Sequence, residues 1–574
     1  MAKKPDLTAD FSFGTLDAPR PEAAKPARFR IALMGDFSGR SAKGEVEIGA
    51  DLAKRRPIKL DVDTIEKVIA GFATTLVLPI GKKGAGIEVE LSSIDDLHPD
   101  ELFEKVEMFA ELVALKRRLA SGATAKGAVS ELREWGKEFG KKVNPPARTS
   151  AGNAVPADRK LSDFAKLVGG TITRKATASP ADELLQRIVG PYIQALPDPN
   201  AAAMQEAVEQ SLAGAMRLVL HHPEFQSVEA QWRMLDLITR SVETDAKLDI
   251  VLYDISAEEL AADLAAQEDL TQSGFCELLV EGTPDGRGRF SAVCGLYTFE
   301  ETPPHAELLG RIAKVCAHVN APFFGAISTG FMEVPKDERH HLVAEAWDAL
   351  RALPEAGHVA LASPRFLLRR PYGAKSEPIY EFDFEEFTES EGLSGMLWAN
   401  PVALVVILLS RSFRKTGPSL GLGQVMSLGE MPYHYVKDRY GDQVALPCTE
   451  RNLTQTRTQA AIARGLMPVV SVKGRDEVRL ASFQSLAGAT VLGPWSDVPP
   501  PKPKADPPRQ AEAEEEATDD SSDDSDASSD GGDDDLAALL AGFDTETPDE
   551  DAGGESTGDD EEMDADLAAL LASL

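Results

Sequence analysis

Cysteine is scarce in this 574-residue sequence, which contains only Cys276, Cys294, Cys316 and Cys448. No two of them have Cys-x-x-Cys spacing, and all four lie among apolar neighbours. Four cysteines are too few to stabilise a chain of this length by disulfides, and their spacing does not match a zinc ribbon. The sequence therefore predicts buried free thiols in a reducing compartment.

Long hydrophobic runs are also missing. The most apolar run, Val402–Leu409, has eight residues, whereas a membrane-spanning helix needs about 20. This run predicts a buried strand or a core helix. The first residues, Met1–Pro5, lead into no apolar segment, so we expect no signal peptide. These observations predict a soluble, cytoplasmic protein with no direct membrane insertion.

Positively charged residues are few relative to negatively charged ones. The sequence contains 60 Lys and Arg residues and 94 Asp and Glu residues, for a net charge of −34. From Pro501 to Leu574 there are 26 acidic and 3 basic residues, a net charge of −23. The preceding 500 residues carry a net charge of only −11. Such a chain repels a phosphate backbone, so general nucleic-acid binding is not expected.

Signatures of enzymes and of cofactor binding are absent as well. The loop Gly35–Gly39 follows a predicted strand but lacks the GxxxxGK[ST] pattern of a phosphate-binding loop. His340, His341 and Glu345 lack the second histidine of a zinc-protease helix. We predict no cofactor, no metal site and no catalysis. An enzyme whose site converges from distant positions stays open as an alternative, and it would need a deep pocket with perturbed titrating groups.

Composition divides the chain into five parts. Few apolar residues occur at the start, Ala, Gly, Ser, Thr and Pro dominate a middle stretch, and six prolines fall within 499–508. The acidic runs beyond them cannot bury enough apolar surface to offset chain entropy. The predicted parts are a flexible arm (1–27), a first domain (28–119), a linker with short helices (120–180), a second domain (181–498), and a Pro-rich break with a disordered acidic tail (499–574).

The first domain begins with a strand pattern at Arg28–Leu33 and ends with an amphipathic helix pattern at Leu102–Leu119. Phe103, Val106 and Phe109 belong to the apolar stripe of this helix, with Val113 one turn further on. A stripe of this kind is more typical of a core or subunit interface than of a cofactor site. We therefore expect this domain to pack against the second one.

The second domain alternates helix and strand patterns, which predicts a mixed α/β fold. Helices are expected at 202–221 and through Trp232, which we predict to be a core residue. Strands are expected at 247–253 and 277–281, and Ser256–Glu259 has the form of a capping box.

The acidic tail contains the same seven residues, Asp-Leu-Ala-Ala-Leu-Leu-Ala, twice, 31 positions apart. Each copy can form two helical turns with an Asp N-cap and leucines on one face. We predict that these islands are linear motifs that fold on a partner. The leucines are Leu536, Leu539 and Leu540 in the first copy, and Leu567, Leu570 and Leu571 in the second.

Residues 28–119 resemble the small subunit (TssB/VipA-like) of the type VI secretion contractile sheath. The similarity is carried by the segment RFRIALMGDFSGR at 28–40, the strand entry Arg56-Pro57-Ile58, and the end of the helix at 116–119.

Residues 181–497 resemble the large subunit (TssC/VipB-like) of the same sheath. The similar segments are HHPEFQSVEAQWRML at 221–235, which includes Trp232, DIVLYDISAEEL at 249–260, and SPRFLLRRPYGAKSEPIYEFDFEE at 363–386. The most specific signature within them consists of Arg369, Pro371, Tyr372 and Gly373.

This resemblance implies a two-part sheath-subunit fold and a structural role, with both halves fused in one chain. The implied partners are other sheath subunits or copies of the chain itself, the inner tube protein, the baseplate and a AAA+ unfoldase that recycles contracted sheath. The large-subunit similarity ends near Trp495, and the acidic tail replaces strands that link neighbouring subunits in the family. The alternative function is therefore a non-polymerising accessory or scaffold protein that recruits partners through its tail.

Overall fold

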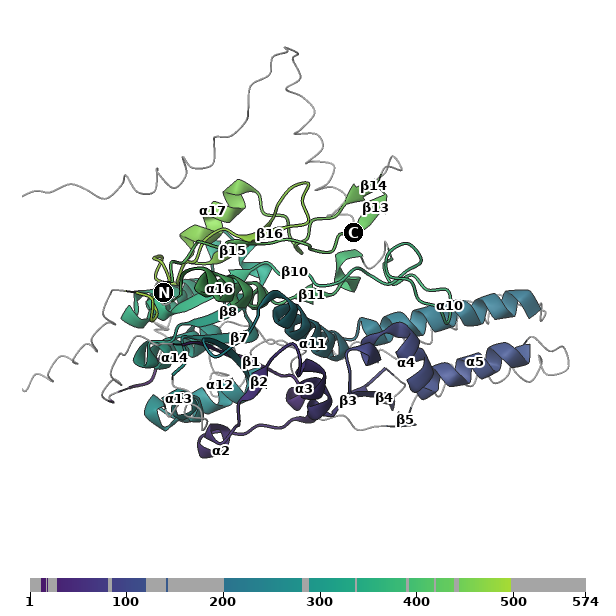
Figure 1. The fold of residues 1–574 in the computed structure, drawn as a ribbon, viewed down its shortest axis with the longest axis horizontal. Helices are drawn as coiled ribbons and strands as arrows, with labels where there is room; N and C mark the ends of the chain where they lie inside the picture. Colours follow the sequence, from purple (N-terminus) through teal and green to yellow (C-terminus); the bar gives the residue numbers. More distant parts are fainter. Residues whose placement is uncertain are drawn as a thin grey trace, which may run out of the picture. The chain divides into compact units, whose positions relative to one another are not determined.

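The structure, a computed structural model, describes residues 12–16, 18, 28–80, 85–119, 141–142, 201–280, 289–335, 338–388, 392–417, 420–437 and 443–496 (Figure 1). We call 28–142 the N-terminal region and 201–496 the C-terminal region. Both leucine islands of the tail, the Pro-rich break and most of the expected linker lie outside the described residues.

A nine-stranded mixed sheet is built from both regions. Its strand order is β12-β16-β15-β9-β8-β7-β1-β6-β2. The N-terminal region supplies β1 (Phe29–Gly35) and the edge strand β2 (Ile58–Leu60). The C-terminal region supplies β6 (Leu248–Asp254), β7 (Ala292–Phe299), β8 (Phe323–Ile327), β9 (Val359–Ser363), β12 (Ser427–Leu428), β15 (Met467–Ser471) and β16 (Val478–Leu480).

Strand β1 lies between two strands that follow it by more than 200 residues. It runs parallel to β6, with Phe29 opposite Leu248, and parallel to β7, with Ile31 opposite Ala292. All seven residues of β1 are buried, as expected for an inner parallel strand covered on both faces. The N-terminal region is therefore an integral part of the sheet of the C-terminal region.

Alternate residues of β1 enter two different hydrophobic cores. Ile31 and Leu33 join the core that contains α11 and α16, whereas Ala32 and Met34 join the core that contains α12 and α14. The period of two follows from the pleat of a strand. The helices of the first core are α3 (Ile65–Phe72), α4 (Pro99–Lys105), α5 (Glu107–Leu119), α10 (Ala201–Leu220), α11 (Pro223–Ser241) and α16 (Val402–Thr416). Those of the second are α2 (Ala50–Ala53), α12 (Ala257–Ala266), α13 (Gly274–Val280), α14 (Pro303–Val319), α15 (His341–Ala352) and α17 (Gln455–Ala463).

Smaller elements complete the described fold. Strands β3 (Thr74–Leu78), β4 (Ala85–Leu91) and β5 (Lys141–Lys142) form an antiparallel sheet in the N-terminal region. Two-stranded pairs are formed by β10 (Phe366–Leu367) with β11 (Trp398–Ala399), and by β13 (Tyr435–Lys437) with β14 (Gln443–Ala445). A single helical turn, α1 (Arg40–Lys43), follows β1.

Three sequence expectations are resolved or corrected. The apolar run at 402–409 is helical, within α16, and not a strand. The strand expected at 277–281 is wrong, because residues 277–280 form the end of helix α13; a short apolar run has no periodicity that distinguishes a strand from a helix. The single helix expected at 102–119 is two helices, because Val106 is extended (φ −86°, ψ 117°) between α4 and α5.

Part of the expected N-terminal arm lies against the C-terminal region. Thr15 N–H donates to the carbonyl of Glu268, and Leu270 N–H donates to the carbonyl of Thr15. Phe13 lies so close to Gly310 that a Cβ there would be 2.1 Å from its ring. These contacts hold Ser12–Leu16 in place.

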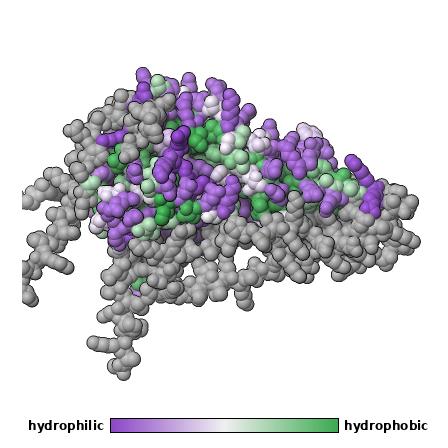
Figure 2. Space-filling view, turned by 90° about the horizontal axis from the view of Figure 1, so that it is seen from below, coloured by the Kyte–Doolittle hydropathy of each residue, from purple (hydrophilic) through white to green (hydrophobic). Residues whose placement is uncertain are grey.

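No helix among the described residues combines the length and the apolarity that a membrane span requires. On the face seen from below, hydrophilic and hydrophobic side chains are interspersed over the described surface (Figure 2).

Candidate functional site between the two regions

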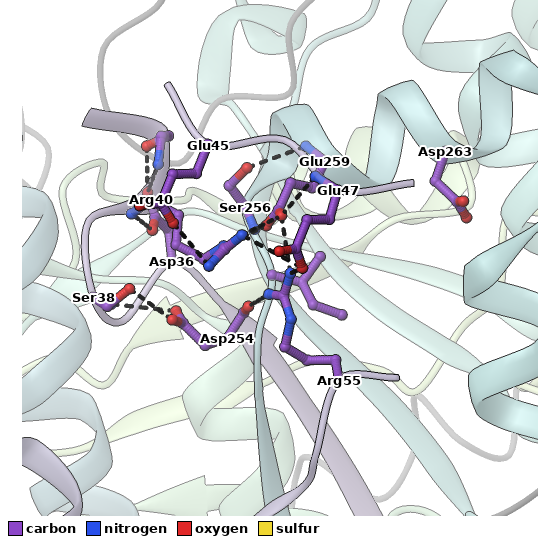
Figure 3. Close-up of polar contacts among 12 residues, drawn as sticks. Asp36, Ser38, Arg40, Glu45, Glu47, Arg55, Asp254, Ser256, Glu259 and Asp263 are labelled. Carbon is purple, nitrogen blue, oxygen red and sulfur yellow. Dashed lines mark hydrogen bonds and ion pairs between the residues drawn. The ribbon is translucent and has the colours of Figure 1, made fainter. Parts of the chain in front are cut away.

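A cluster of four carboxylates lies where the N-terminal region meets β6 and α12. We call Asp36, Asp254, Glu259 and Asp263 the carboxylate cluster (Figure 3). Asp36 directly follows strand β1, and Asp254 is the last residue of the neighbouring parallel strand β6. In open α/β sheets, this end of the strands is where ligands bind. The contacts of the carboxylate cluster therefore decide whether an active site can lie at this end of the sheet.

Asp36 is held by neutral donors of its own loop. Its carboxylate accepts the backbone N–H of Arg40 at 2.5 Å, the backbone N–H of Ser41 at 3.1 Å, and the hydroxyl of Ser41. Gly39, with φ 73°, supplies the left-handed turn that brings these donors back toward Asp36. Burial, together with the nearby charge of Asp254, raises the pKa of Asp36 to about 6.

Asp254 connects the two regions directly. Its carboxylate accepts the backbone N–H of Phe37 at 2.8 Å and of Ser38 at 3.2 Å, and the hydroxyl of Ser38 at 2.6 Å. Burial raises the pKa of Asp254 against the effect of these bonds. Both strand-end carboxylates are therefore occupied by the protein's own donors.

Glu259 is the member of the cluster that binds arginines. It closes the predicted capping box with Ser256 at the start of α12, which is confirmed. Its carboxylate also accepts the guanidinium of Arg40 at 2.9 Å and that of Arg55 at 3.1 Å, both from the N-terminal region. Burial acts to raise the pKa of Glu259, but these donors lower it overall.

Asp263, one turn further along α12, binds two other segments, the loop before α2 and the start of α13, without a cation. It accepts the backbone N–H groups of Gly49 at 2.6 Å, Gly274 at 2.9 Å and Phe275 at 2.9 Å. Burial raises the pKa of Asp263. A Cβ at Gly274 would lie 2.3 Å from the carbonyl oxygen of Gly49, so only glycine permits this approach.

The hollow that borders the carboxylate cluster at Asp36 is too small for a substrate. The hollow beside Asp36, Gly39 and Ser41 has a volume of about 10 Å³, close to the minimum for one water. Among the described residues, no three His, Cys, Asp or Glu side chains are placed to hold a metal ion. The arrangement joins protein segments, because the donors from both regions fill the position where a ligand would bind.

A second buried ionic group, the arginine clamp, consists of Arg369, Glu229, Glu386 and Tyr372. The guanidinium of Arg369 donates to Glu229 at 2.7 Å and to Glu386 at 2.6 and 2.9 Å. It also lies 4.1 Å from the centre of the Tyr372 ring. The clamp fastens the loop after β10 to helix α11.

Three residues of the clamp, Glu386, Arg369 and Tyr372, have shifted pKa values. Burial acts to raise the pKa of Glu386, but Arg369 lowers it to about 2. Burial opposes the charged form of Arg369, yet Glu229 and Glu386 raise its pKa. Burial raises the pKa of Tyr372 to about 12. The ion pair is therefore charged throughout the neutral range.

The clamp loop also meets the N-terminal region. The ring of Tyr372 packs edge-to-face on His98, with centroids 5.1 Å apart. Phe382 stacks on Phe103 at 5.0 Å. The carboxylate of Asp100 accepts the backbone N–H of Tyr380 at 3.2 Å. Helix α4 is thus held by the same loop that Arg369 fixes.

The structure brings the four signature residues together and places Trp232 elsewhere. Arg369, Pro371, Tyr372 and Gly373 are buried in the clamp loop, with the exposed Arg370 between the first two. A Cβ at Gly373 would lie 2.1 Å from the carboxylate of Glu385. Trp232 is fully buried in α11 and donates its indole N–H to the carbonyl of Phe37 at 2.9 Å, beside the carboxylate cluster. Phe109 is also fully buried. The tail leucines lie outside the described residues.

Sequence reasoning missed most of the carboxylate cluster. The loop containing Asp36 and Arg40 was expected to be a turn, and Glu259 was expected to act only as a helix cap. No local pattern marks Asp254 or Asp263, because their donors come from residues more than 200 positions away or from the loop before α13. The position of Asp36 and Asp254 at the ends of predicted strands was the one sequence feature that could have indicated the cluster.

Two families of one machine match this chain in succession. Residues 22–135 match the family described as "Type VI secretion system, VipA, VC_A0107 or Hcp2". Residues 202–487 match VipB, described as "EvpB/VC_A0108, tail sheath N-terminal domain". These two matches define the class as a tail sheath protein. The chain belongs to the type VI secretion sheath proteins and carries the VipA and VipB regions in one polypeptide.

A characterised relative agrees with this assignment. The chain is 32% identical over 299 residues to the type VI secretion system sheath protein TssC1 of Pseudomonas aeruginosa. The match covers 49% of this chain and 60% of that protein. The chain therefore spans well under two thirds of the length of this relative.

Proposed function

We propose that the chain is a structural subunit of a type VI secretion contractile sheath whose small and large halves are paired within one polypeptide. The observation that carries this proposal is β1, which lies between β6 and β7 with seven residues in parallel register to β6. A strand in that position cannot leave without opening the sheet. Fusion makes the pairing intramolecular, so that it does not depend on the concentration of a partner.

In this proposal, the carboxylate cluster and the arginine clamp have a mechanical role and no catalytic one. The clamp, with Pro371 and Gly373, holds the loop that contacts α4, and Trp232 holds the loop after β1. Together they make one rigid body from the two halves. Forces applied to either half during contraction are then transmitted to the other through buried, bonded contacts.

Assembly requires head-to-tail contacts between copies. The proposed partners are further copies or other sheath subunits in the cytoplasm, the inner tube protein and the baseplate. The test is electron microscopy of the purified full chain, in which tubules are the expected result. Discrete particles under all assembly conditions would contradict a polymerising sheath subunit.

The second candidate function is a non-polymerising scaffold that recruits partners through its tail. It is favoured by residues 502–574, whose acidic composition differs from that of the preceding chain and which contain two identical leucine motifs. A multimeric AAA+ unfoldase is one candidate partner. Because the two motifs start 31 positions apart, the tail has a flexible reach of about 30 Å between them, which permits bivalent capture.

A pull-down with the full chain separates this candidate from the first. The matched variants replace leucine by aspartate in one island, at Leu536, Leu539 and Leu540, or in both islands, adding Leu567, Leu570 and Leu571. We expect capture to weaken with one island changed and to be lost with both. Retention of every partner by the double variant would show that the repeat is compositional.

A further inference from the structure

A hollow of about 870 Å³ lies between helix α3, strands β3 and β4, and the helix pair α4 and α5 (Figure 1). Binding pockets in proteins typically have volumes of about 300–1,000 Å³. Buried apolar residues form the floor of this hollow: Ile87, Val89, Leu91, Leu102, Val106 and Met108. Exposed acids form its rim: Glu88, Glu90, Glu107 and Glu111. The one cation among the lining residues, Lys105, pairs with Asp96 and Glu101. The hollow therefore fits an apolar surface that has cations at its side.

Strand β5 fixes the chain at the edge of this hollow. Lys141 of β5 lies opposite Gly86 in antiparallel register, and Gly86 lines the hollow. One residue of an extended chain spans at most about 3.6 Å, so two residues span about 7 Å. The end of the segment that precedes β5 is therefore held next to the hollow.

That segment, residues 128–139, lies outside the described residues and has the sequence pattern of an amphipathic helix. Its large apolar residues recur at steps of three and four and fall on one helical face: Val129, Leu132, Trp135 and Phe139. Arg133 and Lys137, one turn apart, adjoin that face. Gly140, which directly precedes β5, is the residue that most often follows the last turn of a helix. The pattern thus matches the hollow in both polarity and charge.

The length of the chain also permits this arrangement. Helix α5 has 13 residues, about 20 Å, and the hollow borders its first turns at Glu107 and Glu111. The nine steps from Leu119 to Ala128 reach about 30 Å when extended. A helix at 128–139, about 18 Å long, can therefore run back beside α5 and end at β5.

We infer that residues 128–139 form a helix that docks its apolar face into this hollow, with Arg133 and Lys137 at the acidic rim. This is the helix-in-groove mode of recognition, within one chain. The leucine islands of the tail are poorer occupants, because their flanking aspartates would face the acidic rim. The match to the VipA family supports the inference, since it extends to residue 135, well beyond α5.

The docked helix moves the boundary between the two halves. The small-subunit half then extends through Lys142, and the linker begins after it instead of at residue 120. This inference goes beyond the proposed sheath role and does not depend on tubule formation.

The test is hydrogen exchange of the full chain, read by mass spectrometry on peptides that cover 128–139. We expect exchange at least about tenfold slower than in a synthetic peptide of the same residues, because a free helix of this length is marginal in water. Leu132→Asp with Trp135→Asp should remove this protection, since unpaired charges would enter an apolar hollow. Glu134→Gln with Glu138→Gln, on the opposite helical face, is the matched control and should retain it. Strand β1 should stay protected in every variant, which shows that the fold is intact.

A second variant tests the hollow itself. Ala70 is exposed on α3 and lines the hollow, so Ala70→Trp should obstruct docking and speed exchange at 128–139 about tenfold. Ala460→Trp, at an exposed position of α17, is its control. A photoreactive residue at position 135 should cross-link to residues of the hollow in the same chain. Free-peptide exchange rates in the wild type, protection that survives Ala70→Trp, or cross-links to the tail or to a second copy would each overturn the inference.

Discussion

The carboxylate cluster and the arginine clamp are equally deep in the protein, yet their carboxylates behave in opposite ways. Asp36 has neutral donors and its pKa is raised to about 6, whereas Glu386 faces Arg369 and its pKa is lowered to about 2. Glu259 shows the cause within the cluster itself, because it binds Arg40 and Arg55 and its pKa is lowered. Burial alone therefore does not decide whether the pKa of a carboxylate is raised or lowered. The presence of a neighbouring cation decides it.

This difference has a consequence for how the two sites hold the halves together. The clamp stabilises its loop only while Arg369 and its carboxylates are all present, since Arg369 or Glu386 alone would be a buried charge without its main partner. The cluster joins loops through many backbone donors. At neutral pH, each of its carboxylates without a neighbouring cation lowers the free energy of unfolding, because a buried charge is unfavourable. The clamp should therefore be the more sensitive to loss of a side chain, and the cluster the more sensitive to pH.

The largest effect is expected at the clamp, from Arg369→Met. The substitution leaves Glu386, which is 1% exposed, without its arginine, and leaves the fully buried Glu229 with Arg233 alone. We expect a loss of about 3–5 kcal/mol in unfolding free energy, measured by denaturant titration. Arg365→Gln is the control, because the pair of Arg365 with Glu450 is half exposed and should contribute at most about 1 kcal/mol. Equal effects of the two changes would remove the distinction between buried and exposed pairs.

On the cluster side, Trp232→Ala removes the support of the loop after β1. Its side chain is fully buried and bonds to the carbonyl of Phe37. A buried large-to-small change of this kind costs about 3–5 kcal/mol. Tryptophan fluorescence should also lose a blue-shifted component. A near-neutral variant would contradict both the core role and the link to the cluster.

Asp36→Asn tests the pH dependence that the comparison implies. The pKa of Asp36 is raised in the folded state, from 3.8 to about 6, so its contribution is present below pH 4 and is lost as the pH rises through 6. The wild type should gain up to about 3 kcal/mol from this group between pH 7 and pH 4, and the Asn variant should lack that gain. Parallel stability profiles of the two proteins over this range would refute the assignment.

Glu386 titrates in the opposite sense and at lower pH. Its pKa is lowered from 4.5 to about 2, so its stabilisation is complete above pH 4.5 and is lost as the pH falls through 2. The pH interval between 4.5 and 6 therefore reports on the cluster without disturbing the clamp.

Gly274→Ala should have a smaller effect, because it adds one methyl group against the backbone. The new Cβ would lie 2.3 Å from the carbonyl oxygen of Gly49 and 2.8 Å from Cβ of Leu52, so the loop that Asp263 holds must shift. We expect a loss of about 1–3 kcal/mol. Gly71→Ala is the control, since no atom lies within 4 Å of the added Cβ. Thermal unfolding of both variants decides the point.

The sequence predicted the mixed α/β class, the capping box at Ser256 and the buried state of Trp232, because each depends on a local pattern. It also located the signature loop by similarity. The position of β1 was not predictable from its own pattern, since an apolar strand does not specify which strands flank it. The same holds for Asp263, whose three donors are assembled by tertiary contacts. The break at Val106 was missed because the apolar stripe continues through it.

The smallest effect expected is that of Tyr372→Phe, which separates hydrogen bonding from charge within the clamp. The hydroxyl of Tyr372 accepts a bond from Arg233 at 2.8 Å, while the ring lies beside Arg369 and edge-on to His98. The substitution keeps the ring and both ion pairs of Arg369, so only one bond to a cation is lost. We expect a loss of about 1 kcal/mol by denaturant titration. A loss as large as that of Arg369→Met would place the strength of the clamp in the hydroxyl, and the contrast between cation-compensated and uncompensated carboxylates would no longer explain the two sites.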